Sequence, residues 1–368
     1  MTRTLLMVSQ PTVAGVAQCV MDWSIGLRQR GWNVIVACPG DGWLATRLMD
    51  SEVDVRRWDA VRSPVRGLPT ESTRLTTIVE QTDPDIVFLH GSKAGLIGRW
   101  VLRGRLPTAF APHSWSFEAV TGAVSWAALQ WERLAAKWTR LFVCVSEAEQ
   151  SLGQRSGVSG EYLVARNGID LEAVQWFSDQ DRNSLRGDLD IPPTTQALVC
   201  VGRICPQKGQ DVLLHAWPEV ATDDRTLTFV GGGPDLALLS GTNNDPRVRF
   251  LGDSDRAEAL RWMTAADLVV LPSRWEGMAL VPLESMAVGT PVIASDVNGM
   301  REAVSANVGQ LVRPEDPRAL AAAIRDWLDN AGPDVRKASR RHVEDGFDIQ
   351  KTISTIDDAL RDILADPS

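Results

Sequence analysis

The sequence has few of the features that mark secreted or membrane-spanning proteins. Its five cysteines form no Cys-x-x-Cys pair, and an odd count without a spacing pattern fits a reducing cytoplasm. No stretch approaches the roughly 18 apolar residues that cross a bilayer. The apolar run near the first Met is also too short for a signal peptide. We therefore expect a cytoplasmic protein.

Positive charge is scarce as well. The chain of 368 residues carries 38 Lys and Arg against 47 Asp and Glu, a net charge of −9, which argues against wrapping of nucleic acid. The deficit lies in residues 181–368, because residues 1–180 hold equal numbers of both signs. Residues 93–140 are instead basic, which indicates either solvated helix faces or a surface for an anionic acceptor or a membrane. This segment contains Lys93, Arg99, Arg103, Arg105, Arg133, Lys137 and Arg140 against Glu118 and Glu132.

Tyrosine is almost absent, whereas tryptophan is abundant: the chain has one Tyr, 8 Phe and 14 Trp. Within residues 125–138 Trp131, Leu134 and Trp138 recur at helical spacing beside basic side chains. Such a stripe is typical of a packed core. An amphipathic basic face of this kind is also compatible with docking on anionic lipid, which leaves open a peripheral position at the inner face of the membrane.

Short apolar runs alternate with stretches of helical periodicity along the whole chain. Continuous apolar runs favour strands buried on both faces of a parallel sheet. Their alternation with helices predicts an α/β fold of two doubly wound, Rossmann-like sheets. The expected strands are 4–9, 33–38, 85–90, 107–112, 141–145 and 162–165 in the first half, and 197–202, 226–230, 248–251, 268–272, 291–294 and 309–312 in the second.

These elements predict two domains. Residues 1–176 form the first domain, the polar, Pro-ended segment 177–193 is the expected linker, and residues 194–349 form the second domain. Residues 350–368 hold a last helix that can pack on either domain, including back on the first. Because ligands bind at the carboxyl ends of strands in such sheets, the cleft between the domains is the expected active site.

The loop VGRICPQKG, residues 201–209, follows a strand and carries two cations five residues apart. Arg203 can bind a diphosphate as a fork and Lys208 as a point charge. Gly202 and Gly209 let a ligand approach the backbone closely. We therefore favour a phosphate-binding loop over a solvated surface loop.

The segment FVGGGP, residues 229–234, is a weaker signal. It places three glycines between a strand and a helix, but it lacks the Gly-x-Gly-x-x-Gly dinucleotide pattern. A tight structural turn and a ligand contact are equally compatible with it.

Residues 273–295 contain two carboxylates, Glu276 and Glu284, separated by seven residues. Pro282 favours a helix start, so we expect Glu284 in the first helical turn, beside free N–H groups that attract phosphate. A carboxylate there can accept hydrogen bonds from ribose hydroxyls. The simpler interpretation is that both glutamates only complement the helix dipole.

Taken in order, these segments resemble the GT-B glycosyltransferases of family 4, which are retaining enzymes that use nucleotide-sugar donors. Glu276 and Glu284 are similar to the family's E-x7-E element, and VGRICPQKG to its strand–Arg–Lys–Gly loop. In the first half HGSKAGLIGR and PHSWSF resemble a subgroup that assembles cell-surface polysaccharides. The resemblance covers nearly the whole chain and implies a GT-B fold of two domains facing across a cleft.

The resemblance also implies roles for individual residues. Arg203 and Lys208 hold the donor diphosphate, Glu284 binds the ribose, and Gly202 and Gly231 belong to the nucleotide-sugar site. Glu276 and the backbone of Gly277, Met278 and Ala279 contact the sugar, and the backbone around Leu251 meets the base. His113 lies beside the reacting centre, and Gly15 lies in a loop near the phosphate and acceptor. The family often has two glycines in that loop, whereas this chain has Ala14 in place of the first.

The expected activity is therefore transfer of a hexose-type sugar from a nucleoside-diphosphate sugar, UDP rather than GDP, with retention and without a metal. Arg203 and Lys208 stabilise the departing diphosphate, which itself takes the acceptor proton, and His113 and Glu276 orient the sugar or acceptor. The acceptor is a hydroxyl of a glycan, a lipid-linked saccharide or a small molecule.

Three alternatives remain from the sequence. One is a sugar-nucleotide 2-epimerase-like isomerase of the same fold, and another is a non-catalytic sugar-nucleotide-binding protein. The third is a metal-dependent GT-A enzyme with an Asp-x-Asp motif, for which the chain offers Asp83 and Asp85, Asp188 and Asp190, or Asp253 and Asp255.

Overall fold

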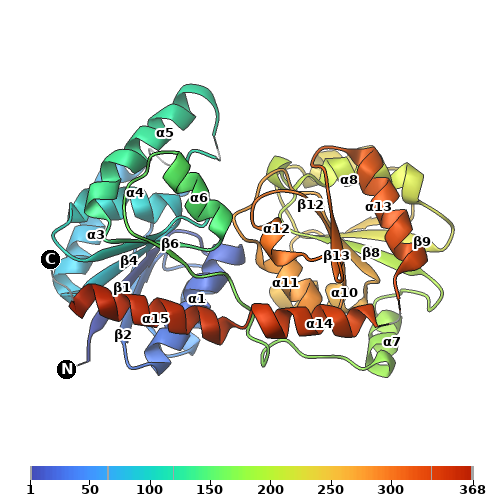
Figure 1. The fold of residues 1–368 in the computed structure, drawn as a ribbon, viewed down its shortest axis with the longest axis horizontal. Coiled ribbons are helices and arrows are strands. Elements are labelled where there is room, and N and C mark those ends of the chain that lie inside the picture. Colours follow the sequence, from blue (N-terminus) through green and yellow to red (C-terminus); the bar gives the residue numbers. More distant parts are fainter. Residues whose placement is uncertain (1, 64–65, 119, 333, 366–368) are drawn as a thin grey trace. The chain divides into compact units, whose positions relative to one another are not determined.

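The computed structural model describes residues 2–63, 66–118, 120–332 and 334–365. The chain divides into two compact units (Figure 1). The first joins Met1–Asn167 with Ile349–Ser368, and the second is Gly168–Asp348. The first unit is thus built from both ends of the chain.

Seven parallel strands form the sheet of the first unit: β1 (Thr4–Ser9), β2 (Asn33–Cys38), β3 (Asp54–Arg57), β4 (Ile86–His90), β5 (Thr108–Ala111), β6 (Leu141–Cys144) and β7 (Tyr162–Val164). Their order is β3-β2-β1-β4-β5-β6-β7, so the direction of winding reverses between β1 and β4. The strands β4, β5 and β6 are buried throughout, as expected for strands covered on both faces.

The helices of the first unit pack around this sheet. They are α1 (Ala14–Gln29), α2 (Trp43–Asp50), α3 (Leu68–Thr82), α4 (Gly91–Leu102), α5 (Gly122–Ala135), the 3-10 turn η1 (Ala136–Trp138), α6 (Glu147–Arg155) and α15 (Ile349–Ala365). Three of the abundant tryptophans, Trp23, Trp58 and Trp115, are fully buried in this unit. Core packing therefore accounts for part of the tryptophan excess.

The carboxyl-terminal helix α15 belongs to the first unit. Its buried residues Ile349, Ile353, Ile356 and Leu360 recur at helical spacing and form one apolar face. This face packs along α1, and Trp32 Nε1 donates a 2.7 Å hydrogen bond to Asp357 of α15.

Six parallel strands form the sheet of the second unit: β8 (Gln196–Val201), β9 (Arg225–Val230), β10 (Val248–Phe250), β11 (Leu268–Leu271), β12 (Val292–Ser295) and β13 (Gly309–Val312). Their order, β10-β9-β8-β11-β12-β13, reverses between β8 and β11. The helices are α7 (Asp179–Asp188), the 3-10 turn η2 (Pro206–Lys208), α8 (Gln210–Val220), α9 (Leu236–Thr242), α10 (Arg256–Ala265), α11 (Leu280–Ala287), α12 (Met300–Ala303), α13 (Pro317–Asn330) and α14 (Val335–Gly346).

The predicted α/β class with two doubly wound sheets is confirmed, and each predicted strand lies within one residue of its observed bounds. One strand, β3, was missed. Its sequence Asp-Val-Arg-Arg is polar because it lies at the edge of the sheet, where no residue is fully buried. An apolar run, which identified the other strands, is therefore absent there.

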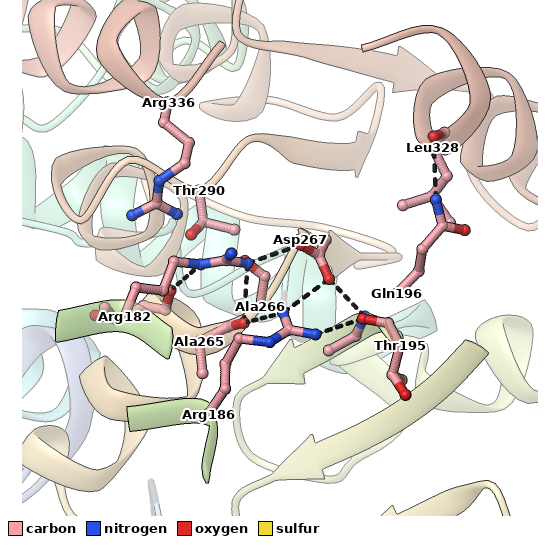
Figure 2. A network of polar contacts seen from close by, with 12 residues as sticks. Arg182, Arg186, Thr195, Gln196, Ala265, Ala266, Asp267, Thr290, Leu328 and Arg336 are labelled. Atoms are coloured by element: carbon pink, nitrogen blue, oxygen red, sulfur yellow. Dashed lines mark hydrogen bonds and ion pairs between the residues drawn. The ribbon is translucent and has the colours of Figure 1, made fainter. Parts of the chain in front are cut away.

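The segment 177–193 is not a linker; it belongs to the second unit. It contains α7, whose two arginines reach the base of the sheet (Figure 2). Arg182 contacts Asp267 at 2.7 Å and Arg186 contacts it at 3.0 Å, and both also donate to the Ala265 carbonyl. Arg186 is only 3% exposed. The polar, Pro-ended sequence predicted a linker, whereas its cations are held by a shared carboxylate. The chain instead crosses between the units near residues 167 and 348.

We expect Asp267→Asn to lower the free energy of unfolding by about 3 kcal/mol, because it leaves two largely buried guanidinium groups without their counter-charge. Denaturation of the purified chain in urea measures the change. Asp54→Asn is the matched control, since the side chains of Arg56 and Asp54 are 42% and 43% exposed and the pair contributes about 1 kcal/mol or less. Equal losses in the two variants would contradict the assignment.

Candidate functional site

Most of the expected site residues lie at one edge of the second sheet. In a parallel sheet all carboxyl ends meet at the same edge, and ligands bind where the strand order reverses. Here the reversal lies between β8 and β11. The loops after β8, β9, β10 and β11 carry the predicted diphosphate, base and sugar contacts.

The loop after β8 presents its two cations differently. Arg203 is exposed, and within the described part of the chain its guanidinium forms no ion pair. Its backbone carbonyl accepts a 3.1 Å hydrogen bond from Gln210 Nε2, and Gln210 is 1% exposed. The buried side-chain amide of Gln210 thus holds the backbone of this cationic loop, a contact that the sequence did not predict.

Lys208 and Glu276 meet across the reversal point. Lys208 Nζ lies 2.5 Å from Glu276 Oε1, and the two side chains are 23% and 7% exposed. The pair joins the loop after β8 to the loop after β11, and a pocket beside it is also lined by Gln210, Ser273 and Ala279. The structure therefore brings together two residues that lie 68 positions apart in the sequence.

Glu284 is not in the first turn of its helix, contrary to the expectation. The helix α11 begins at Leu280, two residues before Pro282, so Glu284 lies in the second turn. Its carboxylate accepts a 2.6 Å hydrogen bond from Arg256 Nε and is 9% exposed. No local pattern indicated this partner, because Arg256 begins α10 after a different strand.

Gly231 is required by the packing of neighbouring loops. Its φ of +137° is rare for L side chains, and a Cβ there would lie 2.3 Å from the carbonyl oxygen of Gly202. Gly231 also donates a 3.0 Å backbone hydrogen bond to Gly252, the residue after Leu251. The glycine-rich segment is thus a tight turn between three loops. Leu251 itself is 38% exposed at the same edge of the sheet.

The segment Gly277, Met278 and Ala279 lies between Glu276 and the start of α11. Met278 is 5% exposed, whereas Gly277 and Ala279 are half-buried. Ala279 has extended backbone at the N-cap position, and no side chain caps the helix. The N–H groups at the start of α11 follow Glu276 closely in the sequence. Ala279 also lines the same pocket as Lys208 and Glu276.

A third ion pair fixes the loops after β8 and β11 to each other. Arg274 donates two hydrogen bonds, at 2.9 and 2.7 Å, to the carboxylate of Asp211. These bonds lower the pKa of Asp211 below its ordinary value. Arg274 N also donates to the Gln207 carbonyl at 2.8 Å. The cationic loop is consequently held in place without using Arg203 or Lys208.

In the first unit, His113 follows β5 and makes a 3.2 Å contact between its Nε2 and Nδ1 of His90, the last residue of β4. Burial lowers the pKa of His113 to about 4, and burial and the neighbouring His113 lower that of His90. Both rings are therefore neutral near pH 7.

Gly15 lies near the start of α1 and is exposed. A Cβ at this position would meet no atom within 4 Å, so the packing of the described residues does not require glycine there. The preceding Ala14 has a φ of 68°, the left-handed region that glycine adopts at lower cost.

The Asp-x-Asp candidate after β10 has structural roles. Asp255 caps α10 by accepting a 2.8 Å hydrogen bond from Glu258 N, and Asp253 lies against Gly232.

In the described ranges no helix is long and apolar enough to cross a membrane.

The two doubly wound parallel sheets have the GT-B class of glycosyltransferase fold, as the solved structures with the same fold show. The Anabaena protein Alr3699/HepE, solved in complex with UDP and glucose, has the same fold with a TM-score of 0.84. It is 21% identical in sequence, and the match covers 98% of this chain and 100% of that chain.

The particular family follows from the sequence comparisons. The model "Glycosyl transferase 4-like domain" matches residues 14–168, and "Glycosyl transferases group 1" matches residues 195–330. A D-inositol 3-phosphate glycosyltransferase of Mycobacterium sp. strain KMS is 31% identical over 77% of this chain and 71% of its own length. The chain belongs to the family 4 glycosyltransferases, as its motifs predicted.

A second relative matches over less of its length. The D-inositol 3-phosphate glycosyltransferase of Nocardioides sp. strain JS614 is 33% identical over 50% of this chain, and the match spans 44% of that enzyme.

Two glycines provide a test of the loop packing. We expect Gly231→Ala to lower the free energy of unfolding by about 2 kcal/mol, because its Cβ would meet a backbone carbonyl in a strained conformation. Gly15→Ala is the matched control and should change stability by less than about 0.5 kcal/mol, since its Cβ meets open space. Thermal unfolding of both variants checks the prediction, and a stable Gly231→Ala protein would contradict it.

Proposed function

We propose that the chain is a retaining glycosyltransferase that moves a hexose-type sugar from a nucleoside-diphosphate sugar, UDP in preference to GDP, to an acceptor hydroxyl. The observation that carries the proposal is the Lys208–Glu276 pair at the β8–β11 reversal, with the exposed Arg203 on the same loop. A cation and a carboxylate in contact suit the two ends of a sugar diphosphate, because one binds phosphate oxygens and the other binds sugar hydroxyls.

The proposed mechanism follows from the charge that develops when the glycosidic bond breaks. The sugar passes through an oxocarbenium-like state, while the diphosphate gains negative charge that Lys208, Arg203 and the backbone N–H groups at the start of α11 stabilise. The departing phosphate oxygen accepts the proton of the acceptor hydroxyl. These cations carry the role that a metal ion has in other transferases, so the proposal requires no metal.

The remaining residues position the donor. Glu276 and the backbone of 277–279 contact the sugar hydroxyls, Glu284 accepts from the ribose hydroxyls, and the backbone at Leu251 meets the base. Because Glu284 is paired with Arg256, that arginine fixes the orientation of the carboxylate. His113 orients the sugar or the acceptor, since a group whose pKa is about 4 is a weak base at neutral pH.

Gly15 is assigned to the approach of the donor phosphate or the acceptor. Its Cβ position is open, which suits a site where a ligand comes close to the backbone. Gly202 and Gly231 shape the diphosphate loop through their backbone.

Measurements in solution separate the proposal from the isomerase and from the non-catalytic binder. A sugar-nucleotide 2-epimerase-like isomerase converts the donor without any acceptor, whereas a transferase requires one for turnover to a new glycoside. A non-catalytic binder takes up the nucleotide sugar and leaves it intact with every acceptor tried.

We expect UDP-glucose to raise the unfolding temperature more than GDP-mannose at equal concentration, because the ligand that binds more tightly stabilises the folded state more. Lys208→Ala should remove this shift and lower transfer by about 100-fold or more, the loss typical of removing one stabilising group from a developing anion. Lys337→Ala, which removes an exposed lysine of the same unit, is the control. Near wild-type turnover in Lys208→Ala would contradict the role assigned to Lys208. A product of inverted anomeric configuration would contradict the retaining mechanism.

The acceptor is proposed to be a lipid-linked saccharide reached from a membrane surface. The α5 surface, defined here as Trp100, Val124, Trp126, Leu134 and the exposed cations Arg103, Arg105, Arg133 and Lys137, combines apolar and basic groups. Trp126 is 66% exposed and Val124 is 60% exposed, although α5 is rich in apolar residues. In Figure 1 α5 extends beyond the neighbouring helices of the first unit.

The acidic residues of the same segment do not offset this charge. Glu132 is buried and paired with Arg99 at 2.7 Å, and Glu118 accepts a 3.0 Å hydrogen bond from Trp115 N in a half-buried position. The cations of the α5 surface are therefore exposed and not neutralised by these two carboxylates, and Arg103 lies 4.1 Å from the ring centroid of the exposed Trp100. Exposed tryptophan beside cations is a combination that binds an anionic lipid interface. Trp131 and Trp138, in contrast, pack on each other.

We expect the chain to sediment with vesicles that contain phosphatidylglycerol and to remain in solution with vesicles of phosphatidylcholine alone. Each cation near such a surface contributes about 1 kcal/mol, so Arg103→Gln with Lys137→Gln should weaken binding by at least about tenfold. Trp126→Ser should also weaken it, whereas Leu238→Ser, an equally exposed apolar residue in the second unit, serves as the control. No sedimentation at low salt would overturn the membrane proposal and leave the donor assignment untouched.

A further inference from the structure

Two histidines end neighbouring strands of the first sheet and contact each other. His90 is the last residue of β4, and its register partner Ala111 is the last residue of β5, two positions before His113. Nδ1 of His90 lies 3.2 Å from Nε2 of His113, within hydrogen-bond distance. His90 has no exposed surface, whereas His113 is half-buried.

The surroundings of the pair are aromatic. The ring of His90 lies against Phe88 and Trp23, with centroids at 4.2 and 5.5 Å, and Trp23 also contacts His113 at 5.5 Å. Neither histidine is paired with a carboxylate in the described ranges, and burial lowers the pKa of both. Both imidazoles are thus neutral, and one of them must donate its single N–H to the other.

The two possible hydrogen-bond directions differ in whether the buried Nε2 of His90 carries a proton or a lone pair. This atom has no hydrogen-bond partner among the described residues. If His113 donates, Nε2 of His90 must carry a proton, and a buried N–H is left without an acceptor. If His90 donates, the unpartnered atom is only a lone pair. Unpaired buried donors are the rarer and costlier case, so the second arrangement is favoured.

We propose that His90 donates its Nδ1–H to His113 Nε2 and thereby fixes His113 as the Nδ1–H tautomer. The second nitrogen of His113, Nδ1, then carries a proton and makes no other hydrogen bond in the described part of the chain. His113 acts outward as a hydrogen-bond donor, which suits an oxygen of the sugar or the acceptor. His90 is a positioning residue that acts through His113.

The backbone turn at His113 and Ser114 also helps to position the His113 ring. His113 and Ser114 have φ angles of 53° and 101°, which side-chain-bearing residues rarely adopt. Ser114 N donates a 2.5 Å hydrogen bond to the carboxylate of Glu149, which is 3% exposed and also accepts from Val145 N at 2.8 Å. The backbone turn that carries His113 is therefore fixed by a buried carboxylate.

This inference extends the proposed function, because an outward donor is useful only if His113 contacts substrate. The tautomer itself can be measured without turnover. The chain has four histidines, so nitrogen-15 NMR of the imidazole rings can assign each of them by single substitution. We expect the His113 signals of the Nδ1–H tautomer at pH 7. Nε2–H signals for His113 in the wild-type chain would overturn the proposal directly.

Two substitutions at His90 separate its hydrogen bond from its volume. His90→Asn keeps an N–H donor close to the position of Nδ1, so His113 should remain the Nδ1–H tautomer. His90→Phe fills the aromatic site without a donor, so His113 should shift toward the Nε2–H form that an unpartnered imidazole prefers in water. Unchanged signals of His215 and His342 report that the second unit is intact. If His113 keeps the same tautomer in His90→Phe, the proposal fails.

Kinetics test the connection to the reaction. His90→Phe should lower kcat/KM about tenfold, the value of one hydrogen bond, while His90→Asn should recover most of that loss. A changed tautomer with unchanged turnover would reject the role proposed for His113 in transfer and leave the His90 inference standing. Loss of turnover in both variants, with an unchanged tautomer, would reject the inference instead.

Discussion

The parallel direction of every strand pair is the constraint on which the site depends. Because the carboxyl ends of β8, β9, β10 and β11 meet at one edge, residues that are far apart in sequence become neighbours there. The reversal between β8 and β11 opens a place where Lys208 can reach Glu276. The glycine turns and the Arg274–Asp211 pair then hold the surrounding loops close enough for this contact to persist.

Local charge at this edge differs from the charge of the whole chain. The net charge of −9 belongs to the half that contains the proposed diphosphate loop, yet several carboxylates near that loop are already paired with cations. At this edge Asp211 is bound by Arg274, and Glu284 is bound by Arg256. Arg203 stays outside these pairs, so an acidic unit can still present a cation to an anionic ligand.

Sequence reasoning recovered the parts of this protein that depend on local patterns. Apolar runs located every buried strand, and the ordered motifs identified the family, because both are written in consecutive residues. It failed where a partner comes from a distant segment. The polar sequence of α7 predicted a linker because Asp267, the partner of its arginines, lies about 80 residues away. The pairing of Glu284 with Arg256 was not predicted for the same reason. The edge strand β3 lacked the apolar run altogether.

The return of α15 to the first unit has a consequence for synthesis. The second unit, Gly168–Asp348, is an insertion between the two pieces of the first, so its residues are all available before α15 leaves the ribosome. The first unit waits for the last helix to cover the apolar side of α1 and to accept the hydrogen bond of Trp32. Although its strands are made first, the amino-terminal unit is therefore the last to be completed, and a truncated carboxyl terminus leaves the beginning of the chain unfinished rather than its end.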